Sequence, residues 1–337
     1  MKVIKKRPLI ILSVVLIVIL LLSLTVGRYP MSLIEIFQTL KASLSGAEIT
    51  DSQEEILFLL VEIRLPRILA AILVGSALAI SGSVYQAMFV NPLVSPGILG
   101  TLAGASFGAA LGIVVVQSWI ATQVLSFVFA CAAVGLAVLL ASLFSRSTML
   151  VLILGGMVSS AFFTSLSSIM KYIADPTNQL PALTYWLMGT FSNADNAIII
   201  RIGIFMLIGI IYLSTRGKLM NAMSVGDEEA MSLGIPVVKR RLELIAVSTF
   251  ISASTVAIAG TIQWVGLVIP HIMRFFVGPD NRLLLPATAI FGGAFMLFID
   301  TIVRSAFASE VPIGIVTALV LLPLFIVSLY RHKGVWR

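Results

Sequence analysis

The strongest constraint on this chain is Pro8–Gly27 (PLIILSVVLIVILLLSLTVG), a run of apolar and small residues without a single charge. About 20 consecutive apolar residues cross the hydrocarbon core of a bilayer. Similar runs follow, and hydrophobic residues make up 59% of the chain against 11% for charged ones. A soluble protein does not leave so little polar surface. The sequence therefore predicts an integral membrane protein.

The basic residues Lys5–Arg7 before this first run are also typical of a signal peptide. However, the apolar run is longer than the usual apolar part of such a peptide, and no A-x-A cleavage site follows it. We therefore expect a retained helix.

We predict an all-α protein with ten membrane-spanning helices. A nine-helix alternative exists because Leu244–Pro270 contains no charge, so the seventh and eighth spans read as one apolar segment. The ten predicted spans cover approximately residues 8–27, 62–82, 92–116, 119–143, 149–170, 197–214, 241–259, 264–277, 283–303 and 313–330.

Basic residues gather at the start of the chain, between Arg216 and Arg241, and at the end. The positive-inside rule places these three clusters in the cytoplasm. Both termini are then cytoplasmic, which requires an even number of spans and favours ten. The outer loops, about 28–61 and 171–196, carry acidic residues instead. The net charge of +7 is therefore a property of the cytoplasmic face and does not indicate a nucleic-acid partner.

A faint internal repeat relates AISGSV (Ala79–Val84) to AIAGTI (Ala257–Ile262). The first copy ends span two and the second ends span seven, so five spans separate equivalent points. Two five-helix halves must then be inverted relative to each other, an arrangement common in transporters. We treat residues 1–337 as a single transmembrane domain, with its largest cytoplasmic loop at about 215–240.

Two segments have the composition of a transport pathway. Pro92 and Pro96 interrupt Ser81–Gly100, and irregular backbone at membrane depth has to be buried in protein or line a watery cavity. This segment is either an inner constriction or a plain cytoplasmic turn. In span five, small and hydroxyl residues at i+4 spacing form one stripe, which favours either close helix packing or a pore wall. The stripe consists of Gly156, Ser160, Thr164 and Ser168.

Charged residues near the outer membrane surface suggest contacts of two kinds. Arg64 and Arg67 begin span two, where they either reach for lipid headgroups or form a basic patch for an acidic protein partner. Arg304 lies at the outer end of span nine and is a third member of such a patch. Its i,i+4 spacing from Asp300 predicts an ion pair. The alternative role for Asp300 is proton coupling, because an acid inside a membrane is usually functional.

The stretch VGDEEAMSLGIP (Val225–Pro236) is acidic in an otherwise apolar chain. Ser224 is expected to cap a short helix with Asp227 at its third position, while Gly234 suits the residue after the C-cap. The alternative is a solvated loop helix. Because Ala230, Met231 and Leu233 would give one side an apolar surface, we predict a helix that docks against a partner protein.

Motifs of other function classes are absent from the sequence. No GxxxxGK[ST] occurs, so we expect no P-loop nucleotide site. Two histidines and one cysteine give no metal-ligand spacing, and no catalytic triad is recognisable. We expect a protein that is not an enzyme and binds neither cofactor nor metal.

The stretch Arg64–Gly100 resembles the signature of FecCD-type permeases, the membrane subunits of binding-protein-dependent ABC importers for iron-siderophores, haem and cobalamin. VGDEEAMSLGI resembles the cytoplasmic coupling loop of that family, and Val265–Pro286 and Glu310–Leu329 resemble its C-terminal signatures. One departure lies before Pro323, where the family often has a glycine and this chain has leucines. The resemblance covers the chain from Arg64 onward.

The resemblance implies the family's ten-helix fold, a second permease subunit that is identical or paralogous, two ATPase subunits that bind ATP and magnesium, and an external binding protein. Arg64 and Arg67, with Arg304 as a third, would dock that binding protein. Asn91, Leu93, Ser147 and Thr148 would form an inner gate, with Ser160, Thr164 and Ser168 on the path. Coupling to the ATPase would fall to Gly226, Asp227, Glu228, Glu229, Ala230, Met231, Ser232, Leu233 and Gly234.

The resulting expectation is a multi-pass permease of the bacterial plasma membrane that imports an iron(III)-siderophore. Haem and cobalamin are alternative cargoes, because recognition in such systems lies largely in the binding protein. Two other function classes are a secondary transporter that couples protons through Asp300 or His271, and a receptor without transport. The sequence does not identify the cargo.

Overall fold

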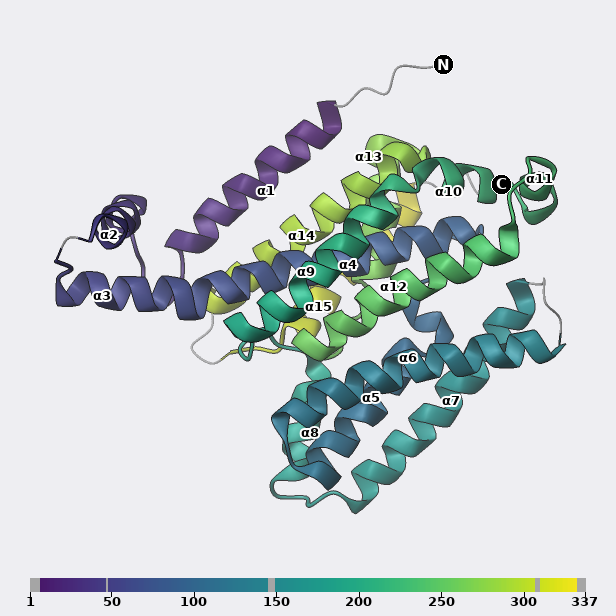
Figure 1. Cartoon of the computed structure of the whole chain (residues 1–337), viewed down its shortest axis with the longest axis horizontal. Coiled ribbons are helices and arrows are strands. Elements are labelled where there is room, and N and C mark those ends of the chain that lie inside the picture. The colour runs from purple at the N-terminus through teal and green to yellow at the C-terminus, as the bar shows by residue number, and fades with distance from the viewer. Residues whose placement is uncertain (1–6, 47, 145–148, 307–309, 332–337) are drawn as a thin grey trace.

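The computed structural model describes residues 7–46, 48–144, 149–306 and 310–331. Within these ranges the chain folds into helices and contains no β-strand, which confirms the all-α prediction. Figure 1 shows that most of the long helices run lengthwise through the molecule.

Each of the ten predicted spans overlaps one apolar helix of the described structure. The helices are α1 (Arg7–Thr25), α4 (Leu65–Met88), α5 (Thr101–Ala110) continued by the π-helix η3 (Leu111–Val116), α6 (Trp119–Phe144), α7 (Met149–Ile173), α9 (Asn196–Thr215), α12 (Val237–Ala259), α13 (Val265–Val277), α14 (Asn281–Ala306) and α15 (Ile313–Arg331).

Six of these helices are long and apolar enough to cross a membrane within the described ranges, namely α1, α6, α7, α9, α12 and α14. The segments 101–116, 265–277 and 313–328 are shorter apolar helices. The total of ten crossings and the cytoplasmic termini therefore stay predictions. The charge-free run from Leu244 to Pro270 is not one helix, because α12 ends at Ala259 and α13 begins at Val265.

The segments between the spans are largely helical too. The predicted outer loop 28–61 contains α2 (Leu33–Ser45) and α3 (Asp51–Phe58), and the π-helix η1 (Leu59–Arg64) joins α3 to α4. Ser32 and Glu35 form a capping box at the start of α2, which explains why a helix begins there. The remaining short helices are η2 (Pro96–Leu99), α8 (Gln179–Met188), α10 (Gly217–Met223) and α11 (Asp227–Ser232).

Helix α4 is the centre of the fold, and all but four of its 24 residues are buried. It packs against α9, α12, α13 and α14. Glycines allow this close approach. A Cβ atom on Gly82 would lie 1.6 Å from the carbonyl oxygen of Gly266 in α13, and one on Gly75 would lie 2.2 Å from that of Gly292 in α14. Small residues commonly bring membrane helices this close together.

Helices α5, α6 and α7 form a second group, which Figure 1 shows beneath α12. The figure also shows α4 and α12, the second and seventh predicted spans, running in opposite directions. That orientation is what inverted halves require.

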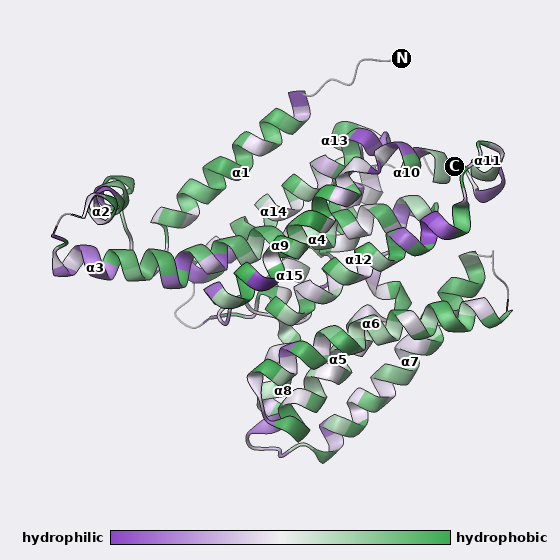
Figure 2. Ribbon diagram, viewed as in Figure 1, coloured by the Kyte–Doolittle hydropathy of each residue, from purple (hydrophilic) through white to green (hydrophobic). Residues whose placement is uncertain are grey.

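Apolar residues cover much of the outer surface, as the green segments of α1, α6 and α7 show in Figure 2. On α1, Ile10 and Ile11 are each 62% exposed, and α7 exposes Leu150, Met157 and Phe162. Apolar patches this extensive mark contact with lipid or with another protein.

Candidate functional site

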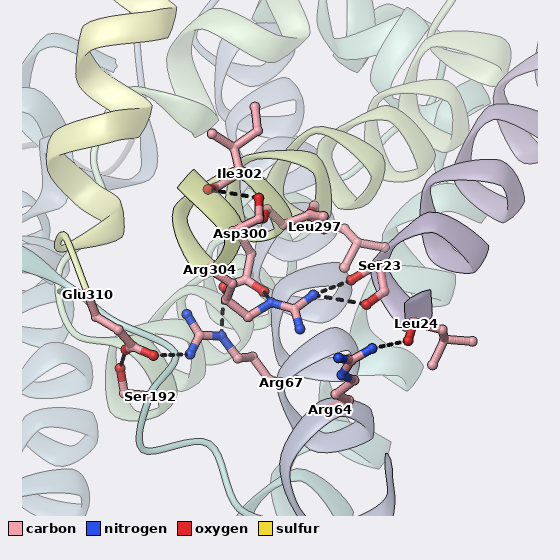
Figure 3. Close-up of polar contacts among 12 residues, drawn as sticks. Ser23, Leu24, Arg64, Arg67, Ser192, Leu297, Asp300, Ile302, Arg304 and Glu310 are labelled. Atoms are coloured by element: carbon pink, nitrogen blue, oxygen red, sulfur yellow. Dashed lines mark hydrogen bonds and ion pairs between the residues drawn. The ribbon is translucent and has the colours of Figure 1, made fainter. Parts of the chain in front are cut away.

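The first candidate site is a buried cluster of charges where α4 and α14 meet (Figure 3). Arg67 donates from Nε to Asp300 Oδ1 and from Nη1 to Glu310 Oε1, at 2.8 Å in both cases. Glu310 also accepts a hydrogen bond from Ser192, on the segment between α8 and α9. One arginine thus ties α4 to α14 and to the residues before α15.

Asp300 is fully buried and holds two arginines. Its second oxygen lies 3.1 Å from Arg304 Nε, which confirms the predicted i,i+4 ion pair. Arg304 continues the cluster by donating from Nη2 to the hydroxyl of Ser23 at 2.6 Å and to the Ser23 carbonyl at 3.1 Å. Asp300 and Arg304 together therefore link α4, α14 and the end of α1.

Arg64 occupies the edge of the same cluster and has no carboxylate partner among the described residues. Its guanidinium donates instead to the backbone carbonyls of Leu24 and Tyr29, where the chain leaves α1. Backbone carbonyls left at the end of a helix need such donors.

The expectation that Arg64, Arg67 and Arg304 form an exposed basic patch is wrong in its geometry. All three residues are less than 10% exposed and are engaged by their own chain. The acids that hold Arg67 lie more than 230 positions away, so sequence spacing gave no sign of them. A recess of about 160 Å³ between Arg28, Arg64, Arg67, Arg304 and Glu310 still reaches the cluster from outside, and docking there stays a prediction.

The second candidate site is α11, the helix in the predicted coupling loop. Ser224 does not cap it, which corrects the expectation, because the Ser224 hydroxyl donates back to the carbonyl of Met220 at 2.8 Å. Gly226 is the N-cap instead. Gly234 takes the left-handed conformation expected of it, with φ of 78°. The bonds Ile235 N to Ala230 O and Gly234 N to Met231 O complete a Schellman motif.

The side chains of α11 divide between the protein and solvent. Ala230 is completely buried, whereas Met231 and Leu233 are 53% and 70% exposed. Glu228 and Glu229 are exposed beside them. Thus α11 presents two large apolar side chains bordered by two acids, a composition that suits a protein contact.

Asp227 anchors α11 to the body of the protein. Its Oδ1 accepts a 2.5 Å charged hydrogen bond from Nη2 of Arg241 in α12. A force on α11 would therefore act directly on α12.

The predicted gate is only partly described. Asn91 and Leu93 lie in the irregular segment after α4, both exposed, and Asn91 Oδ1 accepts the Leu93 N–H at 2.9 Å. Ser147 and Thr148 lie outside the described residues. The segment is a turn rather than a clean helix, as the two prolines indicated.

The stripe on α7 packs closely at one end and is exposed farther along. At one end Gly156 packs closely, because a Cβ there would lie 2.3 Å from the carbonyl oxygen of Ile98. Farther along, Ser160 is half-buried, and Thr164 and Ser168 are exposed. The exposed part is available to line a path, a role that stays a prediction.

One feature was missed by sequence reasoning. A cavity of about 430 Å³ lies beside Asn91, lined by residues of α4, α13 and the start of α14 that include Gln86, His271 and Arg274. Gln86 and Arg274 lie 188 positions apart, so only the fold brings Gln86 beside the α13 residues.

Comparison with known proteins gives a consistent picture. The model of the FecCD transport family matches residues 15–331. The molybdate import system permease of Haemophilus influenzae is 38% identical, with 96% of this chain and 95% of that protein covered. A probable iron chelatin permease of Helicobacter pylori is 39% identical over 82% and 84%, and the vitamin B12 import permease of Yersinia pseudotuberculosis is 37% identical over 81% and 82%.

A solved structure is similar along nearly the whole chain. It is described as an inward-facing conformation of a metal-chelate type ABC transporter and is 35% identical in sequence. The TM-score is 0.85, with 97% of this chain and 100% of the other covered. The arrangement of helices described above is therefore shared with a transporter of known structure.

Proposed function

Since this chain belongs to the FecCD transport family of ABC importer permeases, we propose that its cargo is an iron(III)-siderophore delivered by an external binding protein. The chain is a multi-pass protein of the bacterial inner membrane. The observation that carries the cargo proposal is the match to iron chelatin permeases together with the metal-chelate type structure.

A second candidate cargo is an oxyanion such as molybdate, because the molybdate permease matches 96% of this chain. Cobalamin is supported by the shorter match to the vitamin B12 permease. Haem has no comparably named relative among those described above. A proton-coupled transporter would need a spare buried acid, whereas Asp300 holds two arginines.

We propose that two ATPase subunits, which bind ATP and magnesium, contact one α11 each in a complex with two permease subunits. The exposed side chains of Glu228, Glu229, Met231 and Leu233 support this role. In this arrangement α11 and both chain termini face the cytoplasm. The outer recess at Arg64, Arg67 and Arg304 then receives acidic side chains of the binding protein, where charge pairs contribute orientation more than affinity.

The mechanism follows from the connections of α11. ATP-driven closure of the ATPases moves α11, and the Asp227–Arg241 ion pair passes that motion to α12. Helix α12 packs on α4, so the two helices move together. We propose that this tilting opens the gate at Asn91, Leu93, Ser147 and Thr148. The cargo would move past Ser160, Thr164 and Ser168, whose hydroxyls offer weak hydrogen bonds without holding it tightly.

Uptake of radiolabelled iron in cells with and without the gene tests the cargo. Iron should be supplied as several siderophore complexes, one at a time. Loss of uptake for one complex in the deletion strain, with recovery on complementation, is the expected result. Unchanged uptake of every complex, together with loss of molybdate or cobalamin uptake, would replace the iron proposal with one of those cargoes.

Charge reversal on α11 tests the coupling role. Glu228→Arg with Glu229→Arg should reduce co-purification of the ATPase and leave binding-protein docking intact. The matched control is Glu54→Arg with Glu55→Arg, two exposed neighbouring acids on α3. If the ATPase co-purifies equally with both double variants, α11 is not the docking helix.

A further inference from the structure

The cavity beside Asn91 has the size and composition of a ligand site. Its volume of about 430 Å³ lies within the usual range of small-molecule pockets. Polar residues from five segments line it, namely Gln86, Asn91, Ser224, Asn281, and His271 with Arg274 on α13. None of the residues that line it in the described structure is acidic. The cavity is therefore positively charged through Arg274.

Arg274 lies in the last turn of α13 and is held by one neutral partner. Its Nη2 donates to Gln86 Oε1 at 3.2 Å. Gln86 is itself 2% exposed, and its Nε2 donates to the carbonyl of Leu267 at 3.0 Å. This second bond fixes the amide so that its oxygen meets the arginine. A guanidinium has five N–H donors, so several remain for another group.

No carboxylate of the described residues pairs with Arg274. The nearest acid in sequence, Asp280, is already engaged. Its oxygens accept hydrogen bonds from Arg282 at 2.6–3.0 Å and from Asn221 at 2.7 Å. The dipole of α13 favours a cation in the last turn but supplies no counter-charge on the cavity side.

A charge taken partly out of water needs an opposite charge to offset its lost hydration. We propose that this cavity is an anion-binding site in which Arg274 holds the oxygens of a phosphate-like group, positioned by Gln86. Arginine suits such groups because its planar fork donates two parallel hydrogen bonds. Asn91 can contribute its amide N–H₂, because its carbonyl oxygen is engaged by Leu93.

The anion has two possible sources with the same chemistry. It is either a free oxyanion in solution or the phosphate of a phospholipid headgroup. In both cases the bound anion would bridge α13 and the turn that follows α4, next to Asn91. This site goes beyond the siderophore cargo proposed above, whose transport requires no anion bound in this cavity.

The test measures binding of radiolabelled inorganic phosphate to the full chain in dodecyl maltoside micelles, which contain no phosphate. We expect one phosphate per chain, and binding at least tenfold weaker in Arg274→Gln. Gln86→Glu is a variant of nearly equal size that places a carboxylate against Arg274, so it should also abolish phosphate binding. Lys218→Gln removes an exposed cation outside the cavity and should bind phosphate normally.

The lipid arm identifies the source. If phosphatidylglycerol added to the micelles displaces the phosphate, the ligand is a headgroup; if not, it is a soluble anion. Absence of phosphate binding in the lipid-free micelles, or unchanged binding in Arg274→Gln and Gln86→Glu, would overturn the proposal. So would complete loss of phosphate when the ATPase binds, because Arg274 would then be a protein contact. The assay measures no transport, so its failure is distinct from failure of the proposed function.

Discussion

Asp300→Asn tests whether the buried charge cluster holds α1, α4 and α14 together. Asn preserves the size of the side chain and removes its charge. Arg67 keeps Glu310 as a partner, but Arg304 loses its only carboxylate among the described residues. Removing one member of a buried ion pair typically costs about 3–5 kcal/mol, because the other charge stays buried without compensation. We expect a loss near the lower end, about 3 kcal/mol.

The assay is unfolding of the purified protein from detergent micelles by increasing fractions of dodecyl sulfate, followed by circular dichroism. Glu310→Gln is the control, because Glu310 is 29% exposed in its side chain and its pair should be worth about 1 kcal/mol or less. Adding Arg304→Gln to Asp300→Asn should recover part of the loss, since residues in contact couple by about 0.5–3 kcal/mol. A loss below about 1 kcal/mol for Asp300→Asn, or strict additivity of the two changes, would refute the reasoning.

Three further predictions concern other parts of the molecule. Gly82→Ala should destabilise the protein by at least about 1–3 kcal/mol through overpacking, whereas Gly135→Ala, with open space around its Cβ position, should be neutral or stabilising in the same unfolding assay. Hydrogen bonds from Arg282 lower the pKa of Asp280, so this carboxylate stabilises the fold above its unfolded pKa of about 3.9, and Asp280→Asn should show a shallower loss of stability as pH falls below about 4. Docking of the binding protein should weaken with added salt, because salt screens the attraction between the recess arginines and approaching acidic side chains, and salt-insensitive docking in a pull-down assay would contradict the charge-pair model.

The sequence was sufficient for the features that depend on neighbours along the chain. Apolar runs marked the helices, Gly234 marked the end of α11, and i,i+4 spacing marked the pair of Asp300 with Arg304. Each of these signals comes from residues within one or a few helical turns of each other. The same local reasoning failed at Ser224. Its hydroxyl donates to the carbonyl of Met220 in the preceding helix α10 and therefore does not cap α11.

Features that depend on distant residues were not predictable. Arg67 looked like a free surface cation because its partners, Asp300 and Glu310, lie at the other end of the chain. Arg274 looked like an ordinary basic residue at the end of a helix, and only the fold places Gln86 beside it in a cavity. In both cases the role of the arginine depends on whether a carboxylate lies next to it in the fold. The spacing of residues along one helix does not reveal such a partner.

The two clusters share helix α4. Arg67 lies in its first turn and Gln86 in its last, so the charge cluster and the cavity are separated by 19 residues of one helix, about 28 Å at 1.5 Å per residue. Gly75 and Gly82 hold that helix against α14 and α13 without room for a methyl group. A closely packed interior has low compressibility and transmits strain. A displacement of α4 at Arg67 is therefore transmitted along the helix to Gln86. The proposed docking at the recess and the proposed anion binding beside Arg274 would therefore act on the same rigid element, and we expect a change at either end to alter the other.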